Sequence, residues 1–568
     1  TPGHPEVGLT PGVEATTGPL GQGTANAVGM AIAERALANY FNREDHNIVD
    51  HFTYALVSEG DLMEGIAYEA CSLAGHLGLG KLIFLFDSNQ VTLDGPLSWS
   101  FSEDIASRFT AMNWQVLEVE DGNTDLVALD AALQEAKTEP TKPSILIIKT
   151  TIGYGSPSKC GKSSSHGSPL GAEEVACTKK ALGWEAEEPF TIPLEAAARF
   201  AEVAEHGQSQ QLEWQTRFTT YEQVFPELAV QFKAARAGEI ELDWEAVLPT
   251  WEAGKGLATR SASGEVINAI APQLPLLLGG DADLSGSTNT TIKGGGDFDG
   301  ATGAGRNLHY GIREHAMAGI ANGMACHGDI RPFVATFFVF SDYMRPSVRL
   351  AALSHLPVIY VWTHDSIGVG EDGPTHEPVE HLAALRAMPN LSVVRPADAT
   401  EVAQAWRYAL ERKTGPTALV LSRQKLLVLD RERFASAEGL LKGAYVLSES
   451  QGEMQAILIA TGSEVEVALA AQAALAEEGI QARVVSMPCW EAFEVQSEEY
   501  REEVLPKAVK ARVAIEAGVS LGWQKWIGCE GTLVTLDRFG ASAPGEINMQ
   551  QFGFTTENVV SKVKALLG

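Results

Sequence analysis

Residues 54–65 read Tyr-Ala-Leu-Val-Ser-Glu-Gly-Asp-Leu-Met-Glu-Gly, and residues 82–91 read Leu-Ile-Phe-Leu-Phe-Asp-Ser-Asn-Gln-Val. Each stretch begins with a short apolar run and becomes polar where that run ends. Runs of this kind are typical of strands buried on both faces of a parallel sheet. Residues 63–79 between them are rich in Ala, Leu and Glu and predict a helix. The order strand, helix, strand indicates an α/β protein.

Similar apolar runs recur along the chain and predict three consecutive α/β domains. The first domain has runs at 54–57, 82–86 and 145–148; the second at 276–278, 358–362, 391–394 and 418–421; the third at 457–460, 483–485, 513–515 and 533–536. Residues 188–256 are polar and helical in pattern, which indicates a long connection. We expect mainly parallel sheets flanked by helices, in domains spanning residues 1–225, 226–432 and 433–568.

The composition restricts the classes of partner. The chain has 568 residues, of which 42 are Lys or Arg and 73 are Asp or Glu, so its formal charge is −31. A surface this acidic repels phosphate backbones, which argues against nucleic acid and anionic membranes as partners. A small phosphorylated ligand is still compatible, because a few arginines can converge locally.

The cysteines and the apolar runs bear on the compartment. Six cysteines without a Cys-x-x-Cys pair are too few for a disulfide scaffold, so a reducing cytoplasm is the simplest expectation. No apolar run reaches 18 residues, so we expect no membrane-spanning helix.

Polar side chains follow the first two predicted strands. Glu59 and Asn89 lie 30 residues apart in sequence but at the same edge of adjacent strands. Carboxylate, amide and backbone carbonyl oxygens suit Mg²⁺ or Ca²⁺ holding a diphosphate. Asp61 is a competing ligand. The alternative is that Glu59 and Asp61 are exposed or cap the following helix.

A glycine-rich loop precedes a helical pattern over residues 24–40. Residues 18–23 read Gly-Pro-Leu-Gly-Gln-Gly. Glycines allow close backbone approach and a helix N-terminus favours phosphate, although a plain turn before a helix has the same appearance.

Several further motifs resemble those of transketolases, in order and over essentially the whole chain. They are residues 1–6 (Thr-Pro-Gly-His-Pro-Glu), 18–23, 165–170 (Ser-His-Gly-Ser-Pro-Leu), 311–315 (Gly-Ile-Arg-Glu-His), 363–376, 421–424 (Leu-Ser-Arg-Gln) and 459–464 (Ile-Ala-Thr-Gly-Ser-Glu). The chain departs from the family at Ser58-Glu59-Gly60, where the thiamine diphosphate signature usually has Gly-Asp-Gly. Family members also begin well before the 1–6 motif, so we expect the N-terminal part of the first domain to be lacking here.

The resemblance implies thiamine diphosphate and Mg²⁺, with Ca²⁺ possible, and assigns residues to each role. The implied metal ligands are Glu59, Asn89 and Val91. The implied cofactor-binding residues are Gly18, Pro19, Leu20, Gly60, Glu64, Asn89, His166, Asp283, Glu314, Phe337, Phe340 and Tyr343. The implied catalytic residues are Glu314, His376, His166 and His4. The implied substrate-binding residues are His4, His166, Arg260, Ser287, His364, Asp372, His376 and Arg423.

Each role has a chemical reason and a structural alternative. A buried Glu314 would keep its proton and donate to the aminopyrimidine ring; otherwise it is a surface residue paired with Arg313. Aromatic residues at 337–343 would pack that ring or simply belong to the core. Imidazoles can transfer protons near neutrality, and guanidinium groups match phosphate oxygens, but single histidines and arginines are usually structural.

The implied reaction is reversible transfer of a two-carbon ketol unit in the pentose phosphate pathway. The donor would be a ketose phosphate such as xylulose 5-phosphate, and the acceptor an aldose phosphate such as ribose 5-phosphate or erythrose 4-phosphate. The resemblance also implies a homodimer with active sites at the subunit interface. The alternatives are a catalytically silent scaffold, if the truncation is native, and a related thiamine enzyme such as dihydroxyacetone synthase or a keto-acid decarboxylase.

Overall fold

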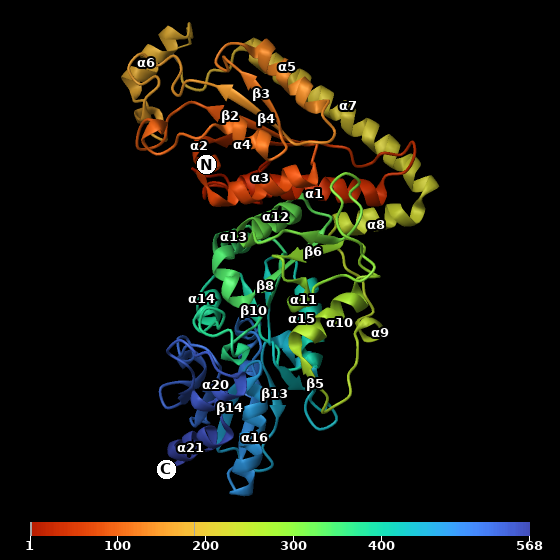
Figure 1. Ribbon diagram of the computed structural model, residues 1–568, viewed down its shortest axis with the longest axis vertical. Helices are drawn as coiled ribbons and strands as arrows, with labels where there is room; N and C mark the ends of the chain where they lie inside the picture. The colour runs from red at the N-terminus through yellow and green to blue at the C-terminus, as the bar shows by residue number, and fades with distance from the viewer. Residues whose placement is uncertain (1–2, 187) are drawn as a thin grey trace. The chain divides into compact units, whose positions relative to one another are not determined.

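The structure is a computed structural model that describes residues 3–186 and 188–568. The chain forms two compact units. Unit 1 consists of Thr1–Glu6, Gly12–Ala237 and Phe298–Gly305, and unit 2 of Val7–Pro11, Gly238–Asp297 and Arg306–Gly568. Most of unit 1 is coloured red to yellow and most of unit 2 green to blue in Figure 1.

Unit 1 contains a parallel sheet with strand order β1-β2-β4-β3. Its strands are β1 (Thr53–Ser58), β2 (Leu82–Ser88), β3 (Gln115–Val119) and β4 (Ser144–Lys149). Three of them confirm the predicted apolar runs. Strand β3 was not predicted, because polar residues interrupt its sequence Gln-Val-Leu-Glu-Val. Ser58 pairs with Asp87, so β1 and β2 end at one edge of the sheet, as expected.

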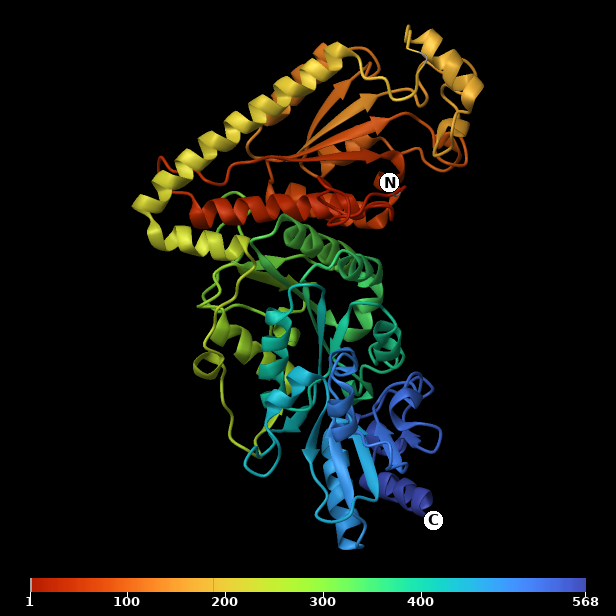
Figure 2. The ribbon, with the colours of Figure 1, turned by 180° about the vertical axis from the view of Figure 1, so that it is seen from behind.

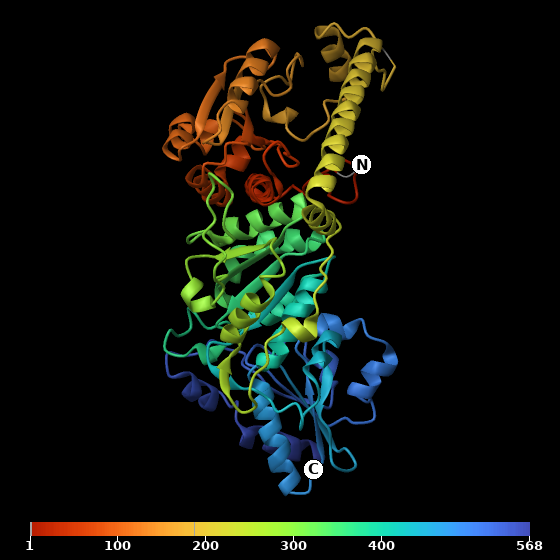
Figure 3. The same ribbon diagram turned by 90° about the vertical axis from the view of Figure 1, so that its right-hand side faces the viewer.

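The helix predicted over residues 63–79 is in fact two helices. Residues Glu59–Met63 form α2, Glu64 is extended, and α3 spans Gly65–Leu77. The separate start of α2 follows from a capping box, in which the Ser58 and Asp61 side chains each accept from the other residue's backbone N–H. Helix α1 (Gln22–Phe41) lies beside α3 (Figures 1 and 3), since alanines and glycines on both helices permit close packing.

The remaining helices of unit 1 are α4 (Ile105–Ala111), α5 (Leu126–Lys137), α6 (Ala172–Ala181), α7 (Leu194–Val224) and α8 (Pro226–Arg236). Figure 2 shows α7 as the long yellow helix that leads into α8. Its C-terminal half is anchored in unit 1, because the Tyr221 hydroxyl donates to the Phe41 carbonyl at 2.7 Å and the Trp214 indole to the Ile48 carbonyl at 2.9 Å. The helical connection predicted for residues 188–256 thus ends with α9 (Trp244–Val247) in unit 2.

Unit 2 contains a six-stranded parallel sheet with order β10-β11-β9-β8-β6-β7. Its strands are β6 (Leu277–Asp281), β7 (Asn307–His309), β8 (Arg331–Phe337), β9 (Ile359–Thr363), β10 (Ser392–Val394) and β11 (Thr417–Leu421). Its helices are α10 (Thr259–Ile270), α11 (Ser285–Thr288), α12 (Glu314–His327), α13 (Ser341–Leu353), α14 (His381–Arg386) and α15 (Ala399–Glu411). Two short strands, β5 (Gly256–Ala258) and β12 (Lys425–Leu427), pair antiparallel.

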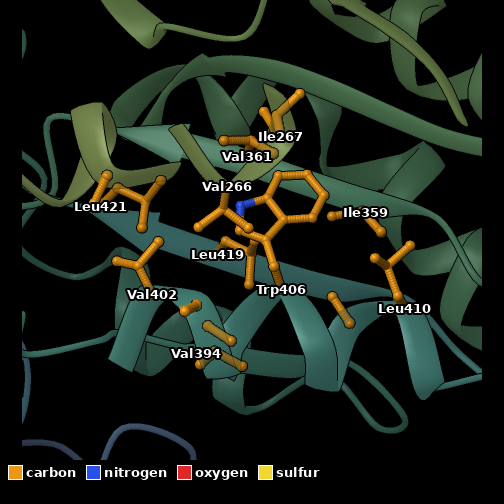
Figure 4. Packing of buried hydrophobic residues seen from close by; sticks show 14 of the residues in the cluster. Val266, Ile267, Ile359, Val361, Val394, Val402, Trp406, Leu410, Leu419 and Leu421 are labelled. Carbon is orange, nitrogen blue, oxygen red and sulfur yellow. The ribbon is translucent and has the colours of Figure 1, made fainter. Parts of the chain in front are cut away.

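The six-stranded sheet is covered on both faces (Figure 1). On one face, Trp406 of α15 packs among Val266 of α10 and Ile359 and Leu419 of the sheet (Figure 4), and its indole donates to Ser263 at 2.8 Å. On the other, Tyr360 and Trp362 face α12 and α13. Burial on both faces explains why β6, β9, β10 and β11 were recognisable as apolar runs, whereas β7 and β8 were not predicted.

The C-terminal region, residues 443–568, adds a five-stranded sheet with order β13-β15-β14-β16-β17, in which only β13 runs antiparallel. Its strands are β13 (Tyr445–Ser448), β14 (Ala456–Ala460), β15 (Ala482–Ser486), β16 (Arg512–Ile515) and β17 (Thr532–Val534). Its helices are α16 (Glu464–Glu477), α17 (Trp490–Glu494), α18 (Glu498–Val504), α19 (Gln524–Ile527), α20 (Gly545–Gln551) and α21 (Thr556–Leu567). The expected fold class, parallel α/β sheets flanked by helices, is confirmed.

Candidate active site

Asp61 has a structural role at the edge of the unit 1 sheet. Its Oδ2 accepts hydrogen bonds from the backbone N–H and the hydroxyl of Ser58, both at 2.9 Å. Its Oδ1 accepts the backbone N–H of Gly21 at 3.1 Å, which holds the glycine loop against this turn. Both Asp61 oxygens therefore hold neighbouring parts of unit 1 together.

Glu59 is buried, with 2% of its surface exposed, and points to the loop after β2. The Gln90 backbone N–H donates to its Oε1 at 2.8 Å. Burial raises the pKa of the Glu59 carboxyl, so a cation beside it would favour the ionised form. Asn89 lies on the same loop, and its Oδ1 accepts the Val91 N–H at 3.0 Å.

The three predicted metal ligands therefore come from one edge of the sheet. Glu59, Asn89 and Val91 offer a carboxylate, an amide and a carbonyl oxygen, a donor set that fits Mg²⁺ or Ca²⁺. The ligand assignment remains a prediction.

The glycine loop lies on the turn that carries these groups. A Cβ on Gly60 would approach Leu20 at 2.9 Å, and one on Gly21 would lie 2.6 Å from Glu64, so the segments are in direct contact. Gly21 itself is left-handed, with φ 76°, and α1 begins at the next residue. The loop thus presents a helix N-terminus beside Glu59, as a diphosphate would require.

Two predicted histidines of unit 1 are exposed. The ring of His4 lies over Gly18, since a Cβ there would be 3.3 Å from His4 Cδ2. His166 is on another loop, at the end of the short 3-10 helix Ser163–Ser165, and is also exposed. Pro19, beside Gly18, is exposed too.

Glu314 is the first residue of α12 in unit 2 and is half-buried. Burial raises the pKa of its carboxyl. Neighbouring Arg313 donates from Nη1 to the Tyr310 carbonyl at 2.9 Å. A carboxyl that tends to keep its proton can donate to a ring nitrogen, which fits the role predicted for Glu314.

The predicted aromatic residues form one group at the end of β8. Ring centroids lie 6.0 Å apart for Phe337 and Phe340, and 6.1 Å for Phe340 and Tyr343. His376 joins them, 5.5 Å from Phe340. Tyr343 is 62% exposed, so this group forms an open aromatic surface. The neighbouring Phe338, which is outside the group, is fully buried and belongs to the core.

His364 links this group to the predicted phosphate-binding residues. Its ring centroid is 3.7 Å from that of Phe337. Burial, then the charges of Arg260, Arg423 and His376, lower the pKa of His364 to about 3. At neutral pH it is therefore an uncharged hydrogen-bonding group, and any positive charge here comes from the arginines.

Arg260 and Arg423 lie on neighbouring segments, since the Arg260 backbone N–H donates to the carbonyl of Ser422, the residue before Arg423, at 3.4 Å. Burial and the charge of Arg423 lower the pKa of Arg260. The Arg260 side chain also donates to the Ser287 carbonyl. A bound anion would offset the repulsion between the two charges, so the pair fits a phosphate group.

Asp283 and Asp372 are exposed, and Asp283 has φ 63° in the left-handed region. Asp283, an implied cofactor-binding residue, lies two residues beyond the end of β6. The strand ends at Asp281, a buried carboxyl that the sequence analysis missed. Burial raises the pKa of Asp281, and its Oδ1 accepts the Leu284 N–H at 2.6 Å. Its place as the last residue of an apolar strand is the signal that could have identified it.

Comparison with known proteins agrees with this geometry. The family model for the transketolase thiamine diphosphate binding domain matches residues 1–241, that for the transketolase pyrimidine binding domain residues 255–427, and that for the transketolase-like C-terminal domain residues 443–555. The chain belongs to the transketolase family. The transketolase of Geobacillus stearothermophilus is 58% identical over 570 residues, covering 100% of this chain and 85% of that protein. The transketolase of Aquifex aeolicus is 52% identical, covering 99% of this chain and 81% of that protein.

Solved transketolases share the fold. The enzyme from Leishmania mexicana superposes with a TM-score of 0.96 at 46% identity, covering 100% of this chain and 83% of that one. A transketolase from Pichia stipitis, solved in complex with sedoheptulose 7-phosphate, gives a TM-score of 0.96 at 41% identity and covers 100% and 84% of the two chains. As a member of this family the chain is a thiamine diphosphate-dependent transferase. Within the described residues, no helix is both long and apolar enough to cross a membrane.

Proposed function

We propose that this chain transfers a two-carbon ketol unit from a ketose phosphate such as xylulose 5-phosphate to an aldose phosphate such as ribose 5-phosphate or erythrose 4-phosphate. One observation carries the proposal. In unit 2, an open aromatic surface with His376 lies beside His364, which in turn faces Arg260 and Arg423. A sugar phosphate has the matching polarity, with a reacting carbonyl at one end and an anion at the other.

Thiamine diphosphate, when bound, supplies a nucleophilic carbon and an electron sink for breaking the sugar's carbon–carbon bond. Glu314 would hold its aminopyrimidine by a hydrogen bond from a protonated carboxyl, and Phe337, Phe340 and Tyr343 would cover the ring. Glu59, Asn89 and Val91 would hold Mg²⁺, or Ca²⁺, on the diphosphate. The Gly18–Leu20 loop, Gly60, Glu64, Asn89, His166 and Asp283 complete the proposed cofactor site.

The proposed substrate residues divide between chemistry and binding. His376, His4 and His166 would move protons to and from sugar hydroxyls. The Thr375 hydroxyl hydrogen-bonds His376 Nδ1 at 2.9 Å, which fixes the ring and leaves Nε2 for the substrate. Asp372 would accept a sugar hydroxyl, and Arg260, Arg423, Ser287 and His364 would bind the phosphate.

We further propose a homodimer with active sites at the subunit interface. Two large side chains are exposed in the single chain: Ile312, two residues before Glu314, at 77%, and Tyr343 of the aromatic surface at 62%. A second copy that covered them would exclude water from the aromatic surface. We also retain the domain boundaries 1–225, 226–432 and 433–568, and a cytoplasmic location, consistent with six free cysteines.

Turnover of xylulose 5-phosphate with ribose 5-phosphate tests the proposal. Activity should require thiamine diphosphate and a divalent cation, and sedimentation should give a dimer. Cofactor binding without turnover would instead favour a silent scaffold. Equal use of phosphorylated and unphosphorylated acceptors would favour a dihydroxyacetone synthase-type enzyme.

A further inference from the structure

The segment that carries Asp372 and His376 has little regular structure of its own. After the 3-10 helix η4 (Ile367–Val369), residues 370–377 form consecutive turns, closed by hydrogen bonds such as Gly373 N–H to the Gly370 carbonyl at 3.0 Å. A catalytic histidine on such a segment needs support from outside, because local turns alone leave several backbone conformations open.

That support comes from residues 540–548 of the C-terminal region. The two backbones touch at glycines: a Cβ on Gly545 would lie 2.6 Å from the Gly368 carbonyl oxygen, and one on Gly370 would lie 3.0 Å from the Gly545 nitrogen. A Cβ on Gly373 would collide with Ser542 Oγ at 2.0 Å. No side chain larger than hydrogen fits between the segments at these points.

Asn548 of α20 is the polar centre of this contact. It is 2% exposed, and its Nδ2 donates to the Ala541 carbonyl at 2.7 Å, to Glu377 Oε1 at 3.0 Å and to the Ile367 carbonyl at 3.4 Å. One buried amide therefore joins its own loop to both ends of the His376 segment. Leaving those acceptors unpaired in a buried site costs free energy. The amide therefore favours the conformation of the His376 segment in which they are hydrogen-bonded.

Glu377, the residue after His376, is the partner that makes the contact specific. It is also 2% exposed, and its Oε2 has no hydrogen-bond partner. A Cβ on Gly540 would lie 2.0 Å from that oxygen, so the C-terminal region closes over the carboxyl. Hydrogen bonds from the Ala541 backbone and the Asn548 amide favour its ionised form.

We propose that Asn548 is a positioning residue for His376: through Glu377 and the Ile367 carbonyl, the C-terminal region holds the His376 segment in its catalytic conformation. This gives the C-terminal region a function in the reaction although none of the proposed substrate residues lies in it. The expected loss of kcat rests on the proposed function, whereas the expected effect on the conformation of the His376 segment does not.

The test compares Asn548→Leu with Asn558→Leu in the intact 568-residue chain. Asn558 is a matched control, because its amide also donates to a carbonyl in the C-terminal region, that of Gly553 at 2.8 Å, away from the His376 segment. Asn548→Leu should lower kcat by roughly tenfold or more, because small misplacements of catalytic groups are costly, with little change in KM or in thiamine diphosphate affinity. Asn558→Leu should leave kcat within about twofold.

Backbone amide hydrogen exchange of residues 367–377 provides a readout independent of activity. Exchange should accelerate at least tenfold in Asn548→Leu and stay unchanged in Asn558→Leu. If Asn548→Leu does not fold, Asn548→Asp keeps the shape, loses the donors and is measured instead. Unchanged exchange in the Asn548 variant, or equal kcat for the two leucine variants, overturns the inference. An inactive parent protein whose exchange still responds to Asn548 refutes the proposed function alone.

Discussion

Glu377→Gln tests whether the C-terminal region encloses a carboxyl that keeps its proton. Burial raises the pKa of Glu377 from 4.5 to about 7. Between those pH values the folded protein holds a proton that the unfolded chain has lost, so stability falls as pH rises through this window and levels off above about pH 7. The full difference is about 3 kcal/mol, from roughly 1.4 kcal/mol per pH unit.

Glutamine resembles the protonated acid and does not titrate, so its advantage over glutamate should grow with pH. Between pH 5.5 and pH 8 we expect that advantage to increase by about 2 kcal/mol. For a cooperative unit of roughly 330 residues this corresponds to about 3 °C in the unfolding midpoint. Calorimetry of parent and variant at the two pH values measures the difference directly.

The matched control is Glu371→Gln, which removes an exposed carboxyl from the same segment. Its effect on the midpoint should be the same at pH 5.5 and pH 8. The reasoning fails if Glu377→Gln shifts the midpoint equally at both pH values, since Glu377 would then be ionised throughout.

Four further substitutions, one of them with a matched control, separate binding roles from structural ones. Glu59→Gln should weaken Mg²⁺-dependent thiamine diphosphate binding at least tenfold, measured by titration, and leave the melting point unchanged. Asp61→Ala should instead lower the free energy of unfolding by about 1 kcal/mol, because it removes the capping box. The opposite result for the two variants would exchange the roles of these residues. Arg423→Ala should raise KM for phosphorylated acceptors at least tenfold and leave KM for unphosphorylated acceptors nearly unchanged. Lys425→Ala, at an exposed residue nearby, is the control. An equal rise in KM for both acceptor classes argues against phosphate binding by Arg423. Arg395 is fully buried and forms ion pairs with Asp365, at 2.8 Å, and with Glu464. Arg395→Leu should therefore lower the free energy of unfolding, measured with denaturant, by about 3 to 5 kcal/mol. A loss below about 1 kcal/mol would contradict the burial of these ion pairs.

The sequence was sufficient where one local pattern determines the structure. The apolar runs predicted most central strands, because strands buried on both faces have no polar residues to obscure them. It was insufficient where polar residues enter a strand, as in Gln115–Val119. The sequence pattern also predicted a helix start at Met63, whereas α2 begins at Glu59. The capping box of Ser58 and Asp61 that starts α2 depends on the conformation of the turn.

The roles of individual carboxyls depended on contacts distant in sequence. The motif favoured Glu59 but left Asp61 as a competing ligand, and sequence alone did not reveal that Asp61 accepts the Gly21 N–H, 40 residues away. The hydrogen bond between Asn548 and Glu377 joins residues that are 171 positions apart in sequence, so no local pattern predicts it. Such pairings arise from tertiary packing, which a motif does not encode.

Carbon-13 tracing tests the central claim most directly. Xylulose 5-phosphate labelled at C1 is incubated with ribose 5-phosphate, thiamine diphosphate, Mg²⁺ and the protein, and the products are followed by nuclear magnetic resonance. Ketol transfer predicts the label at C1 of a seven-carbon ketose phosphate, with an unlabelled three-carbon aldehyde phosphate formed in equal amount. Label in the three-carbon product, or no transfer from a cofactor-saturated protein, would contradict the account.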